Sequence, residues 1–550
     1  MVKLVLGFSH SIGQVFIMGY IKRIITRKKP TNNSGQKRSR ADKSSLKKNL
    51  GENIKTIKGI LGQSPDVVVR QFRAGEDGEL AVGVIYIEGL ADRDLIQDFI
   101  ISVMMQGRNK TGKDSELSFG DGIFKRLTDL MLPVGDVKDI PDYDSLFSAL
   151  LTGDTVILIN GCKKGLAVSS GGWDKRSIEE PTSQTVVRGS KEGFTETLRT
   201  NTALIRRRIK DPSLWMEVKS IGRRTRTDVA VMYIKGVAND RIVEEIHRRL
   251  DRIDIDGILE SGYIEELIQD ETYTLFPTVF NTERPDIAAG ALLEGRIALI
   301  VDGTPFALLV PALFAHFFYT SEDYSQRADI ATLLRLLRYL CFFLTLLIPS
   351  FYIAITTFHQ EMIPTQLLIS LKAQREGVPF PAILEALLME VTFEILREAG
   401  LRMPRAVGQA VAIVGALVLG EAAVQAGIVS PAMVIVVSIT AISSFVIPSY
   451  NLAISIRIMR FIMMFLAAVF GLFGIAIGLL AIILHLCSLR SFGIPYMMPM
   501  SPFVAADQAD TLVRVPYWGF FTRPRLIAQT DMVRQQRPSD AEPRPPEGNE

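Results

Sequence analysis

The stretch IALIVDGTPFALLVPALFAHFFY, residues 297–319, decides how the first half of this chain is interpreted. It is apolar enough for a transmembrane helix, but Asp302 and the Gly and Pro that follow it would then lie in the middle of the bilayer. A β-branched run, an Asp-Gly pair and a second apolar run are typical of a β-hairpin. We therefore predict strands at 297–301 and 306–310, and we expect residues 312–319 to rest against a membrane surface.

An earlier part of the chain repeats this pattern. The stretch VILINGCKKGLAVSS (156–170) also joins a β-branched run through Asn-Gly to a second apolar run, and it is plainly not a membrane span. ALLTGDTVILING (149–161) resembles ALLEGRIALIVDG (291–303), and VIYIEGLADRDLIQDFI (84–100) resembles VMYIKGVANDRIVEEI (231–246). Two matched segments in the same order and at nearly equal spacing indicate two α/β subdomains of like fold.

The chain therefore divides into a soluble part and a membrane part. The predicted fold class is a duplicated α/β soluble N-terminal domain followed by an α-helical multi-pass membrane domain. The expected segments are a basic, disordered N-terminal arm at 1–45, soluble α/β subdomains at 46–175 and 176–320, the membrane domain at 321–487, and a polar, Pro-rich tail at 488–550. The first 60 residues hold fourteen Lys and Arg against two acids, which also suits anionic lipid headgroups; we expect no nucleic-acid partner.

The membrane domain contains four apolar runs close to the roughly 20 residues needed to cross a bilayer. They lie at 339–359, 406–428, 431–454 and 461–487. Residues 381–400 form either a fifth span or a partly buried helix. With five spans and an internal N-terminal domain, most flanking arginines lie inside and the tail lies outside, so the positive-inside rule favours five; the arginines of the tail favour the opposite side. Pro349 and Pro448 lie within spans and are predicted to kink them.

The most unusual stretch is PAILEALLMEVTFEILREAG, residues 381–400, because it places several acids near the membrane. On a helix, Glu390, Glu394 and Glu398 form one stripe. Ionised groups at membrane depth face a bundle interior or water. A ring of such helices from several subunits would line an aqueous path that favours cations.

A second interpretation of this helix stays open. It would lie at the membrane interface, with its apolar face down and its acids in water. Glu394 would then pair with Arg397, and Glu398 with Arg402.

Glu421 is a second candidate for an interior polar contact. It stands alone in GALVLGEAAVQAG, where small neighbours suit close helix packing. Gln409 and Gln425 are expected to belong with it.

The sequence shows no enzyme site. GRNKTGKD (107–114) nearly spells a phosphate-binding loop, but Asp114 occupies the position where a hydroxyl should meet magnesium, so a basic loop is predicted. The three cysteines, Cys162, Cys341 and Cys487, have no metal-ligand spacing. We predict no catalytic residue, no cofactor and no metal site, and the chain is not expected to be an enzyme.

Long motifs in the chain resemble one family, the A subunits of GerA-type spore germinant receptors. The likeness extends from about Leu46 to about Gln535. Four stretches carry it: TERPDIAAGALLEGRIALIVDGTPFALLVPALF (282–314), PSFYIAITTFHQEMIPTQLL (349–368), REGVPFPAILEALLMEVTFEILREAGLRMP (375–404) and GALVLGEAAVQAGIVSPAMVIVVSITAISSFVIPSYNLAISIRIMRF (415–461).

The resemblance implies a multi-pass protein of the inner spore membrane, with its N-terminal domain on the cytoplasmic or core side. Such A subunits work with a transporter-like B subunit, thought to bind the nutrient, and a lipoprotein C subunit. They are proposed to form homo-oligomers that act as nutrient-gated channels for monovalent cations. The alternatives are a non-conducting scaffold or accessory germination protein, which couples the transporter-like subunit to other germination proteins, and a secondary transporter. The absence of an inverted repeat disfavours the transporter.

Overall fold

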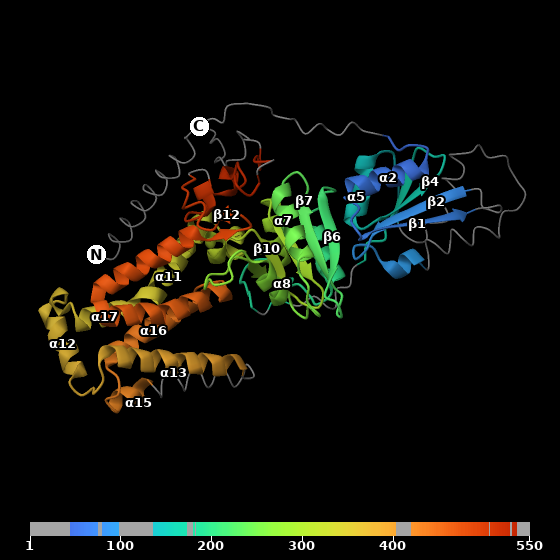
Figure 1. Ribbon diagram of the computed structural model, residues 1–550. Helices are drawn as coiled ribbons and strands as arrows, with labels where there is room; N and C mark the ends of the chain where they lie inside the picture. Colours follow the sequence, from blue (N-terminus) through green and yellow to red (C-terminus); the bar gives the residue numbers. More distant parts are fainter. Residues whose placement is uncertain are drawn as a thin grey trace, which may run out of the picture. The chain divides into compact units, whose positions relative to one another are not determined.

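The computed structural model of the chain is shown in Figure 1. It describes residues 45–74, 80–97, 136–172, 180–181, 183–402, 420–504, 507–528 and 531–535. Outside these residues lie the predicted basic arm up to residue 44, the loop at 107–114, Gln409, and residues 406–419 of one predicted span.

The chain forms two compact units. Unit 1 comprises Met1–Gln269, Val279–Pro311 and Tyr517–Glu550, and unit 2 comprises Asp270–Thr278 and Ala312–Pro516. The boundary after the soluble subdomains therefore falls at Pro311 rather than at residue 320. The tail predicted at 488–550 is not one segment, because its first part belongs to unit 2 and the remainder to unit 1.

Unit 1 contains two five-stranded sheets of the same topology, as the sequence repeat predicts. The first has the order β1-β2-β4-β5-β3 and the second β6-β7-β9-β10-β8. The strands of the first sheet are Val67–Ala74, Leu80–Ile87, Thr155–Ile159, Gly165–Val168 and Val137–Ile140, and those of the second are Leu214–Ile221, Thr227–Ile234, Ile297–Val301, Ala307–Val310 and Phe280–Thr282. The pairings between these strands are all antiparallel, so the mixed α/β composition is confirmed, and the described part of the two sheets contains no parallel βαβ unit.

The predicted hairpin at 297–310 is confirmed. Strand β9 (Ile297–Val301) pairs antiparallel with β10 (Ala307–Val310), and both strands are wholly buried. The Asp-Gly turn is held to the adjacent helix, since the backbone N–H of Leu198 donates to Asp302 at 3.0 Å. The first copy repeats this contact between Leu50 and Asn160 at 3.1 Å, so the two turns serve the same purpose.

Helices cover the sheets on the faces that the period of two defines. In the first subdomain, α2 (Leu50–Ile60) and α5 (Tyr143–Thr152) pack on Ile85, Ile87 and Leu158, while Val84 and Ile157 belong to the cluster on the opposite face. The remaining helices of unit 1 are α6 (Leu198–Arg208), α7 (Asp240–Asp251), α8 (Ser261–Ile268) and α9 (Pro285–Leu293).

A buried ion pair joins the two subdomains of unit 1. Arg206 donates through Nε and Nη2 to Asp66, and its Nη1 donates to the Leu214 carbonyl at 3.2 Å. The Trp215 indole also donates to the Ile60 carbonyl at 3.0 Å. All three nitrogens of the Arg206 guanidinium, Nε, Nη1 and Nη2, therefore donate hydrogen bonds.

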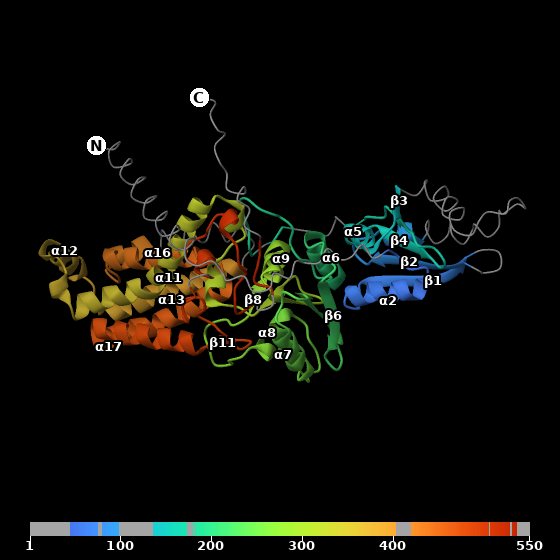
Figure 2. The ribbon, with the colours of Figure 1, turned by 90° about the horizontal axis from the view of Figure 1, so that it is seen from above.

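Unit 2 is helical, and Figure 2 shows its long helices running side by side. The described α-helices of this unit are α10 (Glu322–Ser325), α11 (Ala328–Thr357), α12 (Thr365–Arg375), α13 (Ala382–Arg402), α15 (Gly420–Gln425), α16 (Pro431–Phe445) and α17 (Tyr450–Ser488). Among the described residues, α11 and α17 are long and apolar enough to cross a membrane, and α16 is a shorter apolar helix. The segment expected on a membrane surface, 312–319, instead forms a buried 3₁₀ turn (Phe314–Phe318) in the core of this unit.

Helix α17 is a hairpin of two arms rather than one rod. Gly471 has φ +62° and ψ −140°, which interrupts the helical geometry. A methyl group on Gly474 would meet the Leu466 backbone, and one on Gly478 would meet Met463, so the arms 450–470 and 472–488 lie antiparallel. The predicted span 461–487 is therefore wrong as one helix, because it contains the turn.

One end of the hairpin contacts residues 270–278, which belong to the same unit. Ser455 donates to the Leu275 carbonyl, and His485 lies 2.9 Å from Thr274 (Nε2 to Oγ1). We call this the near end. The turn at Gly471 marks the far end, where it contacts His359 just after α11.

The first part of the tail packs at the near end. The Ser491 hydroxyl donates to the Thr278 carbonyl at 2.7 Å, and the Phe314 N–H donates to the Tyr496 carbonyl at 2.9 Å. The chain thus enters unit 2 and leaves α17 at the same end of the helices.

Candidate functional site

Two acids of the predicted stripe meet three arginines inside unit 2. Glu390 Oε2 lies 2.7 Å from Arg460 Nη2, and each side chain is only 1% exposed. Glu394 accepts from Arg457 Nη1 at 2.7 Å and from Arg460 Nη2 at 3.3 Å. Arg397 approaches Glu394 at 3.6 Å. We call these five residues the Glu–Arg cluster.

Helical spacing explains why these side chains converge. Glu390 and Glu394 are four residues apart on α13, so they share one face, and Arg457 and Arg460 are three apart on the first arm of α17. These two rows face each other. Arg397 closes the cluster toward α16.

Aromatic and hydroxyl groups hold Arg397 in place. Its guanidinium lies 5.0 Å from the Phe393 ring centre and 4.9 Å from that of Phe445, and its Nη2 donates to Ser444 Oγ at 2.6 Å. Cation–π contacts of this kind compensate for lost hydration.

The cluster is neither neutral nor fully hydrogen-bonded. Three arginines face two glutamates, so the five groups carry one excess positive charge when all are ionised. Among the described residues, neither carboxylate oxygen of Glu390 accepts a hydrogen bond, and the Nε atoms of Arg397, Arg457 and Arg460 lack a partner. Buried ionised groups without full compensation are costly.

The remaining acids of the sequence hypothesis lie outside the cluster. Glu398 is exposed and pairs with Arg402. Glu421 on α15 is also exposed, and its Oε1 accepts from Gln425 Nε2 at 3.2 Å. The pairing with Gln425 was expected, but the interior position of Glu421 is wrong for the single chain.

The structure contains contacts expected from each interpretation of the stripe, and the choice between them stays a prediction. The pairs Glu394–Arg397 and Glu398–Arg402, expected for an interfacial helix, are present. Glu390, however, is buried among helices as the interior interpretation requires. The stripe is therefore buried at Glu390 and exposed to solvent at Glu398.

The two prolines have different positions. Pro349 lies inside α11. Pro448 lies in the connection between α16, which ends at Phe445, and α17, which begins at Tyr450. Its predicted role as a kink within a span is therefore wrong, because it separates two helices.

Sequence reasoning did not anticipate the carboxylate at Glu385. It is fully buried and accepts from the backbone N–H of Ser430 at 3.1 Å and from its hydroxyl at 2.9 Å. Arg375 donates to its other oxygen at 3.1 Å. This contact ties the start of α13 to the start of α16 at the far end, and its only sequence signal was an acid off the stripe.

A second buried network lies at the near end, around Asp323. Arg338 Nη1 lies 2.8 Å from Asp323 Oδ2, and Arg335 contacts Asp323 at 3.2 Å and Asp510 at 2.9 Å. In the sequence analysis, these two arginines were used only as charges that flank a predicted span. Their partner Asp510 lies in the tail, far along the chain, so no local pattern could have indicated the network.

Among the residues that the structure describes, no group of three His, Cys, Asp or Glu side chains comes together as a metal site. The three cysteines are free thiols.

Comparison with known proteins identifies the family. The family model described as Bacillus/Clostridium GerA spore germination protein matches residues 55–526. The chain belongs to this family. It is 51% identical to spore germination protein KA of Bacillus subtilis (strain 168), over 90% of this chain and 89% of that protein. It is 38% identical to spore germination protein GerLA of Bacillus cereus, over 88% of this chain and 97% of that one.

One solved structure is also similar. It is the crystal structure of the N-terminal domain of the A subunit of the Bacillus megaterium spore germinant receptor GerK3. The match has 44% sequence identity and a TM-score of 0.40, and it covers 49% of this chain and 98% of that domain.

Proposed function

We propose that this chain is the A subunit of a nutrient germinant receptor and that it triggers germination as an oligomeric, nutrient-gated cation channel in the spore membrane. Family membership supports the germination role. The observation that carries the membrane mechanism is the Glu–Arg cluster, because ionised side chains buried among membrane-length helices are functional candidates by default. The partners would be a transporter-like B subunit and a lipoprotein C subunit.

The membrane topology that we propose has an even number of crossings. The near end holds the start of α11, the end of α17 and the first part of the tail, which supports placing the tail on the side of the soluble domain. This replaces the five-span arrangement, which put them on opposite sides. We place both on the cytoplasmic or core side.

The cluster would act as a latch on the conducting path. In the described arrangement, Glu390 and Glu394 are covered by arginines and cannot attract cations. Nutrient binding to a partner subunit would favour a second arrangement in which α13 shifts relative to the first arm of α17, and the carboxylates would then face water. The unsatisfied atoms of Glu390 and Arg460 support this, since they leave other pairings open.

One observation favours the alternative of a non-conducting scaffold. Each of the four acids of α13 has an arginine partner within this chain, so no carboxylate is uncommitted. An accessory role has less support from the comparisons. The chain is 29% identical to stage V sporulation protein AF and 51% identical to spore germination protein KA.

The test is potassium release from spores after nutrient addition, at verified receptor level. Glu390→Gln with Glu394→Gln should slow release several-fold or change the preference among monovalent cations. Glu398→Gln, which alters an exposed pair on the same helix, is the matched control and should release normally. Unchanged release in the double variant at normal receptor level would favour the scaffold.

The double variant leaves the buried Arg460 and the partly buried Arg397 and Arg457 without acids and can fail to assemble. Glu390→Gln combined with Arg460→Gln preserves the charge balance and serves as the second test. If the latch is correct, this pair should release potassium at lower nutrient concentration, because one ion pair that holds the closed arrangement is gone. A normal nutrient response would contradict the latch.

A further inference from the structure

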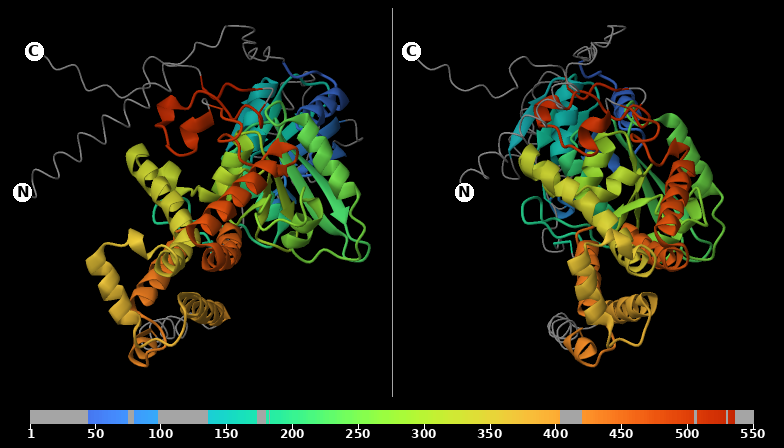
Figure 3. Two further views of the ribbon diagram at one scale, coloured as in Figure 1. Left: turned by 60° about the vertical axis from the view of Figure 1, so that its left-hand side comes forward. Right: turned by 90° about the vertical axis from the view of Figure 1, so that its left-hand side faces the viewer.

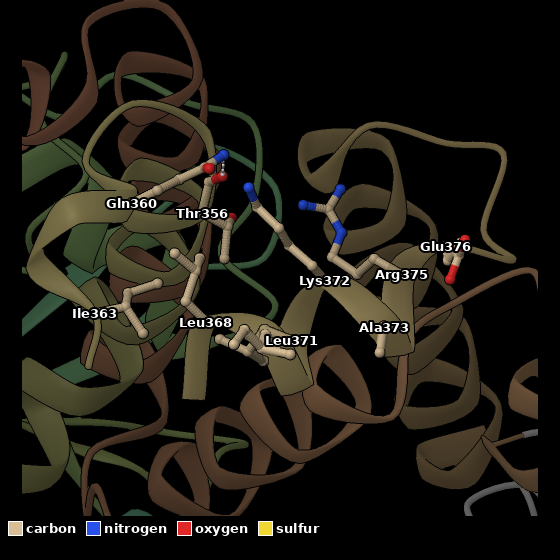
Figure 4. A pocket seen from close by; sticks show the side chains of 10 residues that line it. Thr356, Gln360, Ile363, Leu368, Leu371, Lys372, Ala373, Arg375 and Glu376 are labelled. Atoms are coloured by element: carbon tan, nitrogen blue, oxygen red, sulfur yellow. Dashed lines mark hydrogen bonds between the residues drawn. The ribbon is translucent and has the colours of Figure 1, made fainter. Parts of the chain in front are cut away.

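Two adjoining cavities lie where α11 ends and α12 begins. The first, about 520 Å³, is lined by residues of both helices and is shown in Figure 4. The second, about 470 Å³, lies along α11 and is lined almost wholly by apolar side chains, among them Phe343, Leu347 and Phe351. Thr356, Ile363 and Leu371 line both cavities, so they are continuous. Each volume is in the range of small-molecule sites.

The polar cavity has a cationic wall. Figure 4 shows Lys372 and Arg375 directed to the same side of the cavity, while the Glu376 carboxylate points away from Lys372. Arg375 shares its charge with Glu385. Among the described residues Lys372 has no acidic partner within ion-pair distance, so its ammonium is available to an anion.

The apolar cavity needs a nonpolar occupant. Phe343 and Phe351 are 50% and 45% exposed in the chain, and Leu367 of α12 is 52% exposed. Helix α12 itself has no buried residue, and Figure 3 shows it at the margin of the helices of unit 2. An isolated helix of 11 residues is marginal in water, so α12 requires a covering surface.

We infer that these cavities bind one glycerophospholipid, whose phosphate is held by Lys372 and Arg375 and whose acyl chain lies along Phe343, Leu347 and Phe351. Charge complementarity selects the phosphate, and the continuity of the two cavities selects a molecule that is anionic at one end and apolar at the other. The lipid would tie α12 to α11 beside the Arg375–Glu385 contact. This inference rests on the proposed membrane location.

The test uses the full-length chain in nanodiscs of phosphatidylglycerol with a minor fraction of diacylglycerol, which lacks the phosphate. A photo-crosslinking benzoylphenylalanine replaces Leu347 in one protein and Phe473 in another. Phe473 is 68% exposed on the second arm of α17 and serves as the lipid-facing control. After irradiation, mass spectrometry gives the ratio of phosphatidylglycerol to diacylglycerol adducts at each position.

We expect this ratio to be several-fold higher at position 347 than at 473, and Lys372→Gln should abolish the difference. Arg490→Gln, an exposed basic residue that lines neither cavity, is the matched control and should preserve it. Equal ratios at 347 and 473, or a difference that survives Lys372→Gln, would overturn the site. Adducts between two copies of the chain at 347 would assign the groove to a second subunit and overturn it as well.

Two further outcomes separate the alternatives. If added inorganic phosphate removes the preference at 347, the basic wall binds a free anion, and the lipid inference is wrong. If neither position forms any lipid adduct, the proposed membrane location fails, which is a different result from equal ratios.

Discussion

The two units each contain a buried arginine–carboxylate pair, and the pairs differ in how fully they are hydrogen-bonded. In unit 1, Arg206 donates through Nε and both terminal nitrogens to Asp66 and Leu214. In unit 2, Arg460 Nε and both oxygens of Glu390 have no hydrogen-bond partner among the described residues. A saturated pair specifies one geometry, whereas an unsaturated one leaves alternatives of similar energy. The pair in unit 1 is therefore expected to keep one geometry, whereas the Glu–Arg cluster is the one that we propose to move.

The largest loss of stability is expected at the Arg206–Asp66 ion pair, which joins the two subdomains of unit 1. Arg206→Ala leaves Asp66 buried without its partner and should lower the free energy of unfolding by about 3–5 kcal/mol. Urea unfolding of the full-length chain in detergent, followed by tryptophan fluorescence, measures it. Arg223→Ala is the control, because its pair with Asp254 is 70% and 66% exposed and should contribute little to stability. Similar losses for the two variants would break the comparison.

A smaller effect is expected at the Glu–Arg cluster of unit 2. Arg460→Met should cost about 3 kcal/mol, since Glu390 loses its ion pair while Arg397 and Arg457 remain as partners of Glu394. Adding Glu390→Leu should recover most of this loss, because both buried charges are then absent. Thermal unfolding in detergent measures both variants. If the double variant is as unstable as the single one, Glu390 has a structural partner other than Arg460, and the cluster is not a movable one.

The turn at Gly471 bears on the same comparison between the two ion pairs. The proposed movement of α13 requires that the first arm of α17, which carries Arg457 and Arg460, stays fixed. Gly471→Ala forces a side chain into a conformation that almost only glycine adopts, and it also crowds His359, so a loss of about 1–3 kcal/mol is expected. Gly400→Ala lies within α13 with no atom near its added methyl and should be neutral or slightly stabilising. Thermal unfolding compares the two. Equal stabilities of the Gly471→Ala and Gly400→Ala variants would show that α17 can form its hairpin turn without glycine at position 471.

A further effect is a pH dependence that arises in unit 1. Burial raises the pKa of Glu265, on α8, to about 7, although Asn281 donates to it at 3.4 Å. The folded state therefore holds a proton that the unfolded state releases above its ordinary pKa of 4.5. Stability should fall by up to about 1.4 kcal/mol per pH unit as the pH rises from 4.5 to 7 and then level off. Glu265→Gln should flatten this part of the curve, and a slope that persists in the variant would assign it to another group.

Local patterns were sufficient for the soluble half. Alternation of apolar residues and the Asp-Gly turn predicted the hairpin of β9 and β10, and the repeated motifs predicted two subdomains with one topology. These features depend on residues that are close together in the sequence, which is why the sequence alone could predict them. The likeness of the motifs to GerA-type A subunits was also sufficient for the family.

Unit 2 shows what sequence could and could not determine. The sequence by itself placed Glu390, Glu394 and Glu398 on one helical face, because helical period follows from residue spacing alone. Only the tertiary structure decided which acids are buried, since Arg457 and Arg460 arrive from a helix more than 60 residues further along the chain. It also decided that the apolar run after Tyr450 turns back at Gly471, and that the tail returns to Asp323 through Asp510. The partners of a buried charge are set by which helices pack together, and hydropathy carries no information about that choice.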